Sequence, residues 1–313
     1  MILITGGMGF IGLHAAMSLL GLGEDVVITR FREYRLPSFL LPFLNKRLFV
    51  EKADVRNAED LLRAGRKYAV TGIMHLASPP LRGPVAEGLR SNAEGLLQVL
   101  EAGSKLEVDR IVLASSIAIY AGVDADVWRE DAPLPIDSPY PMTAYKKMFE
   151  IIGCYYSAQT QLSVVSARIS AYGPLARGLY FFPAQAAHAA VKGVPVSTLI
   201  KGGNPPHAED GIDFAYVTDT AEVLARLQTA ASLRHSVYNI GSGRRVTNRE
   251  IADAVRLASP DAVIDLQPGQ SDHPLYPPLH IGRLKEELGW SPRYSVERGI
   301  AEYIDWLKMG NPF

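Results

Sequence analysis

The sequence predicts an α/β fold, in which a doubly wound parallel sheet is followed by a smaller C-terminal domain. Over the first two-thirds of the 313 residues, short apolar runs rich in β-branched residues alternate with longer amphipathic runs. The apolar runs are continuous, which is typical of parallel strands that helices cover on both faces. A glycine-rich turn between the first strand and the first helix is the third observation.

Six strands and four helices are expected in the first two-thirds. The expected strands lie at residues 2–5, 25–29, 47–51, 72–77, 110–115 and 163–168. The expected helices lie between them, at residues 10–23, 58–65, 86–103 and 142–159. Right-handed crossovers between such strands give a doubly wound sheet, which binds ligands at the carboxyl ends of its strands.

The pattern changes after residues 171–174. Two loop-rich stretches follow, at 201–211 and 267–280, among helices that begin at readable caps. Thr247 and Glu250 form a capping-box pattern, and Ser295 precedes the last amphipathic run. We expect one domain from 1–172 with 213–243, and a second from 173–212 with 244–313.

Composition excludes several classes of protein. The net charge of −1 indicates neither a nucleic-acid nor a membrane partner, and no apolar run approaches the ~20 residues of a membrane span. Cys154 is the only cysteine, so neither a disulfide framework nor a zinc site is expected, and no metal is predicted. The chain starts directly with its first strand, without a signal-peptide pattern, and we expect a cytoplasmic protein.

The glycine-rich turn predicts a Rossmann-type dinucleotide site. Gly6 would permit the tight turn, Gly9 would let the backbone approach a pyrophosphate, and Gly12 would let the helix pack on the sheet. Phe10 and Ile11 stand inside the same turn, where free helix N–H groups attract phosphate.

The next strand predicts which dinucleotide is bound. Such strands usually end in an acid that holds the adenosine ribose, but here Arg30 stands at that position, followed by Arg32 and Arg35. Because guanidinium groups bind phosphate well, Arg30 favours NADP(H), with NAD(H) left open. Asp54, with Val55 beside it, follows the third strand and is expected near the adenine.

The motifs together resemble those of the extended short-chain dehydrogenases/reductases, the NAD-dependent epimerase/dehydratase family. They are "TGGMGFIG" at 5–12, "ADV" at 53–55, "IMHLAS" at 73–78, "LASSIAIYA" at 113–121, "SAYGP" at 170–174, "DFAYVTDTAEV" at 213–223, "YNIGSG" at 238–243 and "LGWSPRYSVERGI" at 288–300. The resemblance implies a cofactor contact for Leu76, Ala77 and Ser78. It also implies a homodimer built from the helices near 85–103 and 142–158.

The resemblance implies catalytic roles as well. Ser116 matches the serine that hydrogen-bonds the reacting oxygen, and Lys146 matches the lysine that holds the nicotinamide ribose. The family's proton-carrying tyrosine stands one helical turn before that lysine, where this chain has Met142. A thioether cannot carry a proton. Two tyrosines flank the position, and we favour Tyr140, at the helix entrance, over Tyr145 as a surrogate.

A second departure concerns the substrate. Relatives that act on nucleotide-diphosphate sugars usually carry arginines where this chain has Ile212 and Gln267. Losing both arginines removes charge-assisted hydrogen bonds worth roughly 1.5–3 kcal/mol each, so weak binding of UDP- and dTDP-sugars is expected. Other cations remain as alternative anion binders: Arg168, Arg177, Lys201, Arg244 and Arg245. Residues 207–210 could supply an acid or base from a lid, and a solvated loop is the simpler alternative.

We therefore expect an NAD(P)-dependent epimerase, dehydratase or oxidoreductase that transfers hydride to or from a sugar or sugar-like small molecule. The alternative is a non-catalytic cofactor-binding regulator or scaffold. Met142 favours this alternative, whereas the presence of both Ser116 and Lys146 favours an enzyme.

Overall fold

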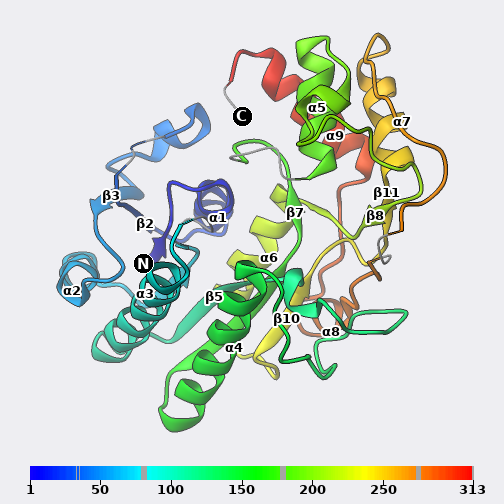
Figure 1. The fold of residues 1–313 in the computed structure, drawn as a ribbon. Coiled ribbons are helices and arrows are strands. Elements are labelled where there is room, and N and C mark those ends of the chain that lie inside the picture. Colours follow the sequence, from blue (N-terminus) through cyan, green and yellow to red (C-terminus); the bar gives the residue numbers. More distant parts are fainter. Residues whose placement is uncertain (33, 35, 79–82, 177–180, 273–275, 312–313) are drawn as a thin grey trace.

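A seven-stranded parallel sheet forms the centre of the molecule. The computed structural model describes the chain except residues 33, 35, 79–82, 177–180, 273–275 and 312–313. The sheet has the order β10-β6-β5-β4-β1-β2-β3, with every neighbouring pair parallel (Figure 1). Its strands are β1 (Ile2–Thr5), β2 (Val26–Arg30), β3 (Leu48–Lys52), β4 (Gly72–His75), β5 (Arg110–Ser116), β6 (Ser163–Ile169) and β10 (Val237–Ile240). The doubly wound α/β prediction is confirmed.

The observed strands follow the six expected runs to within two residues at each end. The seventh strand, β10, was not expected, because its four residues do not stand out from the loops around them. It pairs with β6, in the register Val237↔Ser166, and extends the sheet by one strand.

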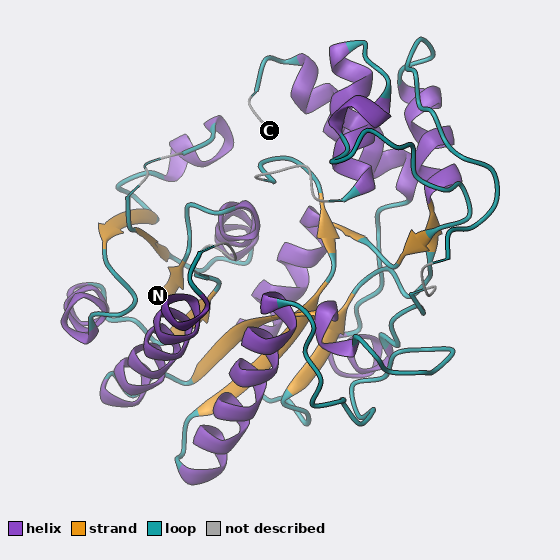
Figure 2. Ribbon diagram, in the orientation of Figure 1, coloured by secondary structure: helices purple, strands orange, loops and turns teal. Residues whose placement is uncertain are grey.

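Helices cover both faces of the sheet (Figure 2). On one face lie α1 (Phe10–Gly21) and α6 (Val217–Thr229), whose apolar residues share a core with Ile4, Met74 and Val112. On the other face lie α2 (Ala58–Lys67), α3 (Val85–Lys105) and α4 (Pro141–Gln159), which share a second core with Leu3, Ile73 and Ile111. Because successive strand residues point to opposite faces, each strand contributes to both cores, and this explains its continuous apolar sequence.

A third core lies beyond the carboxyl ends of the strands. It joins α5 (Phe182–Lys192), α7 (Asn248–Ala258) and α9 (Val296–Lys308), at the upper right of Figure 1. Two short ladders connect it to the sheet: β7 (Ala171–Tyr172) with β9 (Ala215–Tyr216), and β8 (Gly211–Ile212) with β11 (Val246–Thr247). The capping box at Thr247 and the cap at Ser295 are both present.

The remaining elements return to the sheet. In the segment that includes α8 (Gly282–Leu288), Leu284 and Trp290 pack into the core beneath α1 and α6. The short helix η1 (Ser38–Phe43) also packs on α1, and η2 (Ile117–Tyr120) and η3 (Val196–Leu199) are single turns. The domain division predicted from the sequence stays a prediction. The C-terminal segment packs on the sheet through Leu284 and Trp290, and it packs in the third core through α9.

None of the helices in the described part of the chain is long and apolar enough to cross a membrane. Within the same residues, no group of three or more His, Cys, Asp or Glu side chains is arranged to hold a metal ion.

Candidate active site

The glycine turn has the geometry that a phosphate-binding loop requires. Gly6 has a φ of +68°, and a Cβ atom at this residue would lie 2.6 Å from the backbone nitrogen of Ala77. Gly9 is the N-cap of α1, where no side chain caps the first N–H groups. At Gly12, a Cβ atom would lie 2.6 Å from the Gly6 carbonyl oxygen. Gly12 therefore lets the helix pack against the turn itself rather than against the sheet.

The residues predicted to contact the cofactor lie around this turn. Phe10 and Ile11 form the first residues of α1, and both are partly buried. The backbone of Leu76 and Ala77 runs directly beside Gly6. Beyond it, the Ser78 hydroxyl donates to Asn92 Oδ1 at 3.3 Å. Five predicted residues, two from the start of α1 and three from the segment that follows β4, therefore lie at one edge of the sheet.

The ends of β2 and β3 form a basic surface with an aromatic centre. The guanidinium groups of Arg32 and Arg56 lie 5.0 Å and 5.9 Å from the centroid of the exposed Phe31 ring. Arg56 also pairs with Asp54 at 2.7 Å, and this hydrogen bond lowers the pKa of the Asp54 carboxyl. Arg30 ends β2 and is partly exposed.

Arg56 was not singled out from the sequence, although its place two residues after Asp54 was a usable signal. Val55, between them, contacts α3, where a Cβ atom at Gly95 would lie 3.1 Å from its Cγ2. Arg35 lies outside the described residues.

The two predicted catalytic residues, Lys146 on α4 and Ser116 on β5, lie where α4 packs against the carboxyl end of β5. Lys146 is only 6% exposed, and its Nζ donates to the Ala114 carbonyl oxygen at 2.6 Å. Burial lowers the pKa of Lys146 to about 8. Ser116 is the last residue of β5, and its Oγ accepts from the Ala118 N–H at 3.2 Å. Thr143 Oγ1 donates to the Ala118 carbonyl oxygen at 3.0 Å, so α4 is fastened to the turn that follows Ser116.

The three residues discussed as proton carriers differ in environment. Met142 is partly buried in the first turn of α4, on the face of Lys146. Tyr140 is the N-cap of that helix, with extended backbone, and is 63% exposed. Tyr145 is 5% exposed, and its hydroxyl lies 2.3 Å from the position a Cβ atom would take at Gly88. Tyr145 is therefore packed between α4 and α3.

A buried ion pair between β6 and α4 holds the helix that carries Lys146 against the sheet. Arg168 on β6 binds Glu150 on α4 at 2.8 Å, and the Ser115 hydroxyl donates to the same carboxylate at 2.5 Å. Arg168 also donates to the Tyr120 hydroxyl at 2.6 Å. The expectation that Arg168 is available to a substrate anion is wrong, because this ion pair holds it inside the core.

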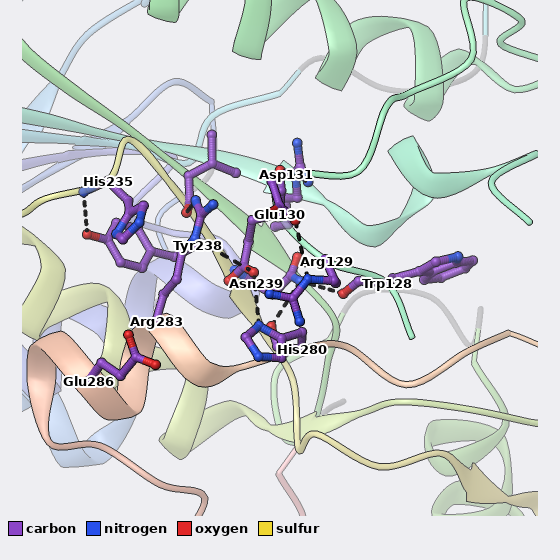
Figure 3. A network of polar contacts seen from close by, with 12 residues as sticks. Trp128, Arg129, Glu130, Asp131, His235, Tyr238, Asn239, His280, Arg283 and Glu286 are labelled. Carbon is purple, nitrogen blue, oxygen red and sulfur yellow. Dashed lines mark hydrogen bonds and ion pairs between the residues drawn. The ribbon is translucent and has the colours of Figure 1, made fainter. Parts of the chain in front are cut away.

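The loop that leads to Tyr140 is anchored by a second polar network, shown in Figure 3. Glu130 is buried, and its carboxylate accepts from the Asn239 N–H at 3.2 Å. His280 and Arg283 lie 3.5 Å and 3.9 Å from the same carboxylate. The network therefore ties the loop before α4 to β10 and to the segment that enters α8.

On the substrate side of the site, Ile212 and Gln267 occupy the two positions where relatives usually carry arginine. Gln267 is engaged elsewhere, since its side chain donates to the Pro205 carbonyl oxygen at 2.7 Å. Ile212 pairs with Val246 and packs among apolar residues. Of the other cations, Arg244 pairs with Glu250 at 2.6 Å, and Arg177 lies outside the described residues.

Residues 207–210 make polar contacts to the second loop-rich stretch and to α7. Glu209 pairs with Arg249 at 2.7 Å, and Asp210 Oδ1 accepts from the Ser271 N–H at 3.0 Å. His207 lies 3.3 Å from the Pro268 carbonyl oxygen. Asp210 and His207 therefore contact the second loop-rich stretch and Glu209 contacts α7, so each of the three side chains already has a polar partner.

A wide depression of about 980 Å³ lies at the opposite, amino-terminal edge of the sheet. The Arg110 guanidinium in its wall donates to the carbonyl oxygens of Leu227 and Ala230, both at 2.8 Å. It includes none of the predicted site residues and is not a candidate for the reaction.

Comparison with known proteins agrees with this geometry. The sequence model of the NAD dependent epimerase/dehydratase family matches residues 2–241. The dTDP-glucose 4,6-dehydratase of Actinoplanes sp. is 29% identical over 327 residues, covering 98% of this chain and 97% of that enzyme. The UDP-glucose 4-epimerase of Azospirillum brasilense is 29% identical over 336 residues, covering 96% and 89%. The solved UDP-glucose 4-epimerase of Thermus thermophilus, in complex with NAD, has a TM-score of 0.79 at 27% identity, covering 98% of each chain.

Proposed function

Because the chain belongs to the NAD dependent epimerase/dehydratase family and is an enzyme of the short-chain dehydrogenase/reductase type, we propose that it acts by hydride transfer on a sugar or sugar-like alcohol or carbonyl. The observation that carries this proposal is the hydrogen bond from buried Lys146 to Ala114, two residues before Ser116, at the carboxyl end of β5; the glycine turn lies at the same edge of the sheet.

The residues at the turn fit a dinucleotide. Gly6 and Gly12 permit the tight turn and its close packing, and Gly9 leaves the helix N-terminus without a capping side chain, so its N–H groups can bind a pyrophosphate. When bound, the nicotinamide would accept a hydride from the substrate carbon or return one to it. In this proposal Lys146 holds the ribose hydroxyls, and Ser116 donates a hydrogen bond to the substrate oxygen that gains or loses a proton.

We propose Tyr140 as the group that exchanges this proton. Its position at the helix entrance, on extended backbone, supports the proposal, since the side chain can turn toward Met142 without breaking the helix. Tyr140→Phe is expected to reduce kcat by roughly 10²–10⁴-fold with little change in cofactor affinity. Tyr145→Phe is the matched control and should have a much smaller effect, because Tyr145 is packed against α3. Turnover at the wild-type rate in Tyr140→Phe contradicts the assignment.

We propose NADP(H) as the preferred cofactor, through Arg30 and the guanidinium groups beside Phe31. The 2′-phosphate of NADP is a dianion, and Arg32 adds to the positive charge at the end of β2, whereas Asp54 offsets the charge of Arg56. NAD remains the alternative, because the Thermus relative was solved with NAD.

The substrate class is proposed from the relatives, which are named for UDP-glucose and dTDP-glucose. They support a sugar substrate that carries a nucleotide. Ile212 and Gln267 support a weaker grip on a diphosphate than an arginine pair would give. A panel of alcohols, sugars and sugar nucleotides, followed by nicotinamide absorbance and by product chirality, tests the proposal. Hydride transfer detected with none of them would contradict it.

Met142 favours a second candidate, a protein that binds the cofactor without catalysis. Tight cofactor binding without turnover on the whole panel is the expected result in that case.

We also propose a cytoplasmic homodimer, since α3 and α4 expose large apolar side chains on one side of the molecule: Val85, Leu89, Leu97, Ile151 and Tyr155.

A further inference from the structure

A groove of about 490 Å³ lies on the α1 face of the sheet, and its lining includes none of the predicted site residues. One wall is α1, another is the end of α9, and η1 closes the side. In Figure 1, α9 approaches η1 across the top of α1. The contact between Phe39 of η1 and Trp306 of α9, at 6.1 Å between ring centroids, joins these walls. The volume falls in the range of small-molecule sites, about 300–1,000 Å³.

The groove has an aromatic and polarizable surface. Phe39 lies between the His14 ring, at 5.7 Å, and Trp306. Met17 and Met309 line the rim, and both are exposed. Aromatic faces attract cations, and thioethers adapt to apolar groups of different shapes. The surface is therefore suited to an apolar body that carries a positive charge.

His14 offers a hydrogen-bond acceptor in this groove. Its Nε2 lies 3.2 Å from the Pro174 carbonyl oxygen, which can only accept, so Nε2 carries the ring proton. Nδ1 then carries a lone pair, for which the described residues provide no hydrogen-bond donor. Burial lowers the pKa of His14 to about 4, so the ring is neutral at physiological pH. A neutral imidazole with a vacant Nδ1 accepts a hydrogen bond from an N–H group.

The groove is negatively charged. Asp305 is exposed, and its carboxylate has no ion-pair partner among the described residues. Glu302, one turn earlier on α9, pairs with Arg298 at 3.1 Å. The described residues that line the groove include no lysine or arginine. A cationic ligand would therefore meet one carboxylate that no described residue pairs with and one open acceptor, both in the lining of the same groove.

We propose that this groove binds a small organic cation, an ammonium group with an apolar body. The ammonium donates to His14 Nδ1 and to the Asp305 carboxylate, and the apolar body lies on Phe39 and Trp306. The site is separate from the proposed reaction site, so the proposal does not depend on the proposed function. Because His14 joins α1 to the Pro174 loop, a ligand here contacts the helix that begins at the glycine turn.

Benzylamine is the probe for this site, with benzyl alcohol and phenylacetate as neutral and anionic analogues of the same size. Isothermal titration calorimetry on the full chain, with and without NAD, should show saturable binding of benzylamine and weaker or no binding of the analogues. Asp305→Asn should weaken benzylamine about tenfold, as expected for one charge-assisted hydrogen bond. His14→Phe, which keeps an aromatic ring but removes the acceptor, should weaken it about fivefold.

The matched control is Asp253→Asn, an exposed aspartate on α7 outside the groove, which should leave the affinity unchanged. Equal binding of benzyl alcohol, an unchanged affinity in Asp305→Asn, or no binding of benzylamine would each overturn the proposal. Competition between benzylamine and NAD would also overturn it, because it would locate the amine in the cofactor site.

Discussion

Replacing Lys146 with methionine should stabilise the cofactor-free protein while removing the proposed ribose contact. Burial lowers the pKa of Lys146 from its ordinary value of 10.5 to about 8. At about 1.4 kcal/mol per pH unit, holding this ammonium in the folded state costs about 3 kcal/mol at neutral pH. The variant also loses the hydrogen bond to Ala114, which destabilises it by about 1 kcal/mol. Methionine has a similar length and no charge, so a net gain of about 2 kcal/mol is expected.

This gain should depend on pH in a defined direction. As pH rises through 8, the folded protein releases the Lys146 proton, whereas the unfolded chain keeps it until about 10.5. Between these values the unfolded state binds more protons, so the wild type becomes more stable as pH rises, and Lys146→Met does not share this change. The advantage of the variant should therefore fall by about 2 kcal/mol between pH 7 and pH 9.5.

Urea denaturation of both proteins at the two pH values measures the effect. Lys52→Met, at the exposed end of β3, is the matched control and should change the free energy of unfolding by less than about 0.5 kcal/mol. The reasoning fails if Lys146→Met is less stable than the wild type at pH 7. It also fails if the difference between the two proteins is the same at both pH values.

Three further predictions concern the cofactor, the assembly and the substrate. Calorimetry should show tighter binding of NADP than of NAD, and Arg30→Ala should remove most of that difference; equal affinities in both proteins would end the preference. Sedimentation should show a dimer at micromolar concentration and a monomer for Ile151→Asp, because a charge would enter the apolar face of α4; a monomeric wild type would contradict this. Thermal-shift titration should show no submillimolar binding of UDP- or dTDP-sugars, and such binding would mean that Lys201 or Arg245 replaces the missing clamp.

The parts of the fold that were predictable depend on local spacing. Gly6, Gly9 and Gly12 lie within seven residues, and the geometry of the turn follows from them directly. The capping box at Thr247 depends on a residue three positions away and was also readable. The strand β10 was missed because its place in the sheet is decided by pairing with β6, which no local pattern records.

The parts that were not predictable depend on pairs distant in the chain. Arg168 and Glu150 belong to different elements, so nothing in the sequence showed that the arginine is neutralised in the core. Gln267 was recognised as the replacement of an arginine, but its bond to Pro205, 62 residues earlier, appears only in three dimensions. The buried state of Lys146 is a similar case, because its partner is a carbonyl oxygen on β5 and not a side chain.

The interleaving of the third core with the sheet has a consequence for synthesis of the chain. Helix α5 leaves the ribosome before β10, yet the helices that cover it, α7 and α9, are made after the last strand. The apolar side chains of α5, among them Phe182, therefore stay exposed to solvent until the carboxyl-terminal part of the chain has been synthesised. A chain that stops after β10 would have a complete sheet and an uncovered α5, and such exposed surfaces favour aggregation. A chimera that takes its third core from a relative must likewise replace two separate segments together, the one with α5 and the one with α7 and α9.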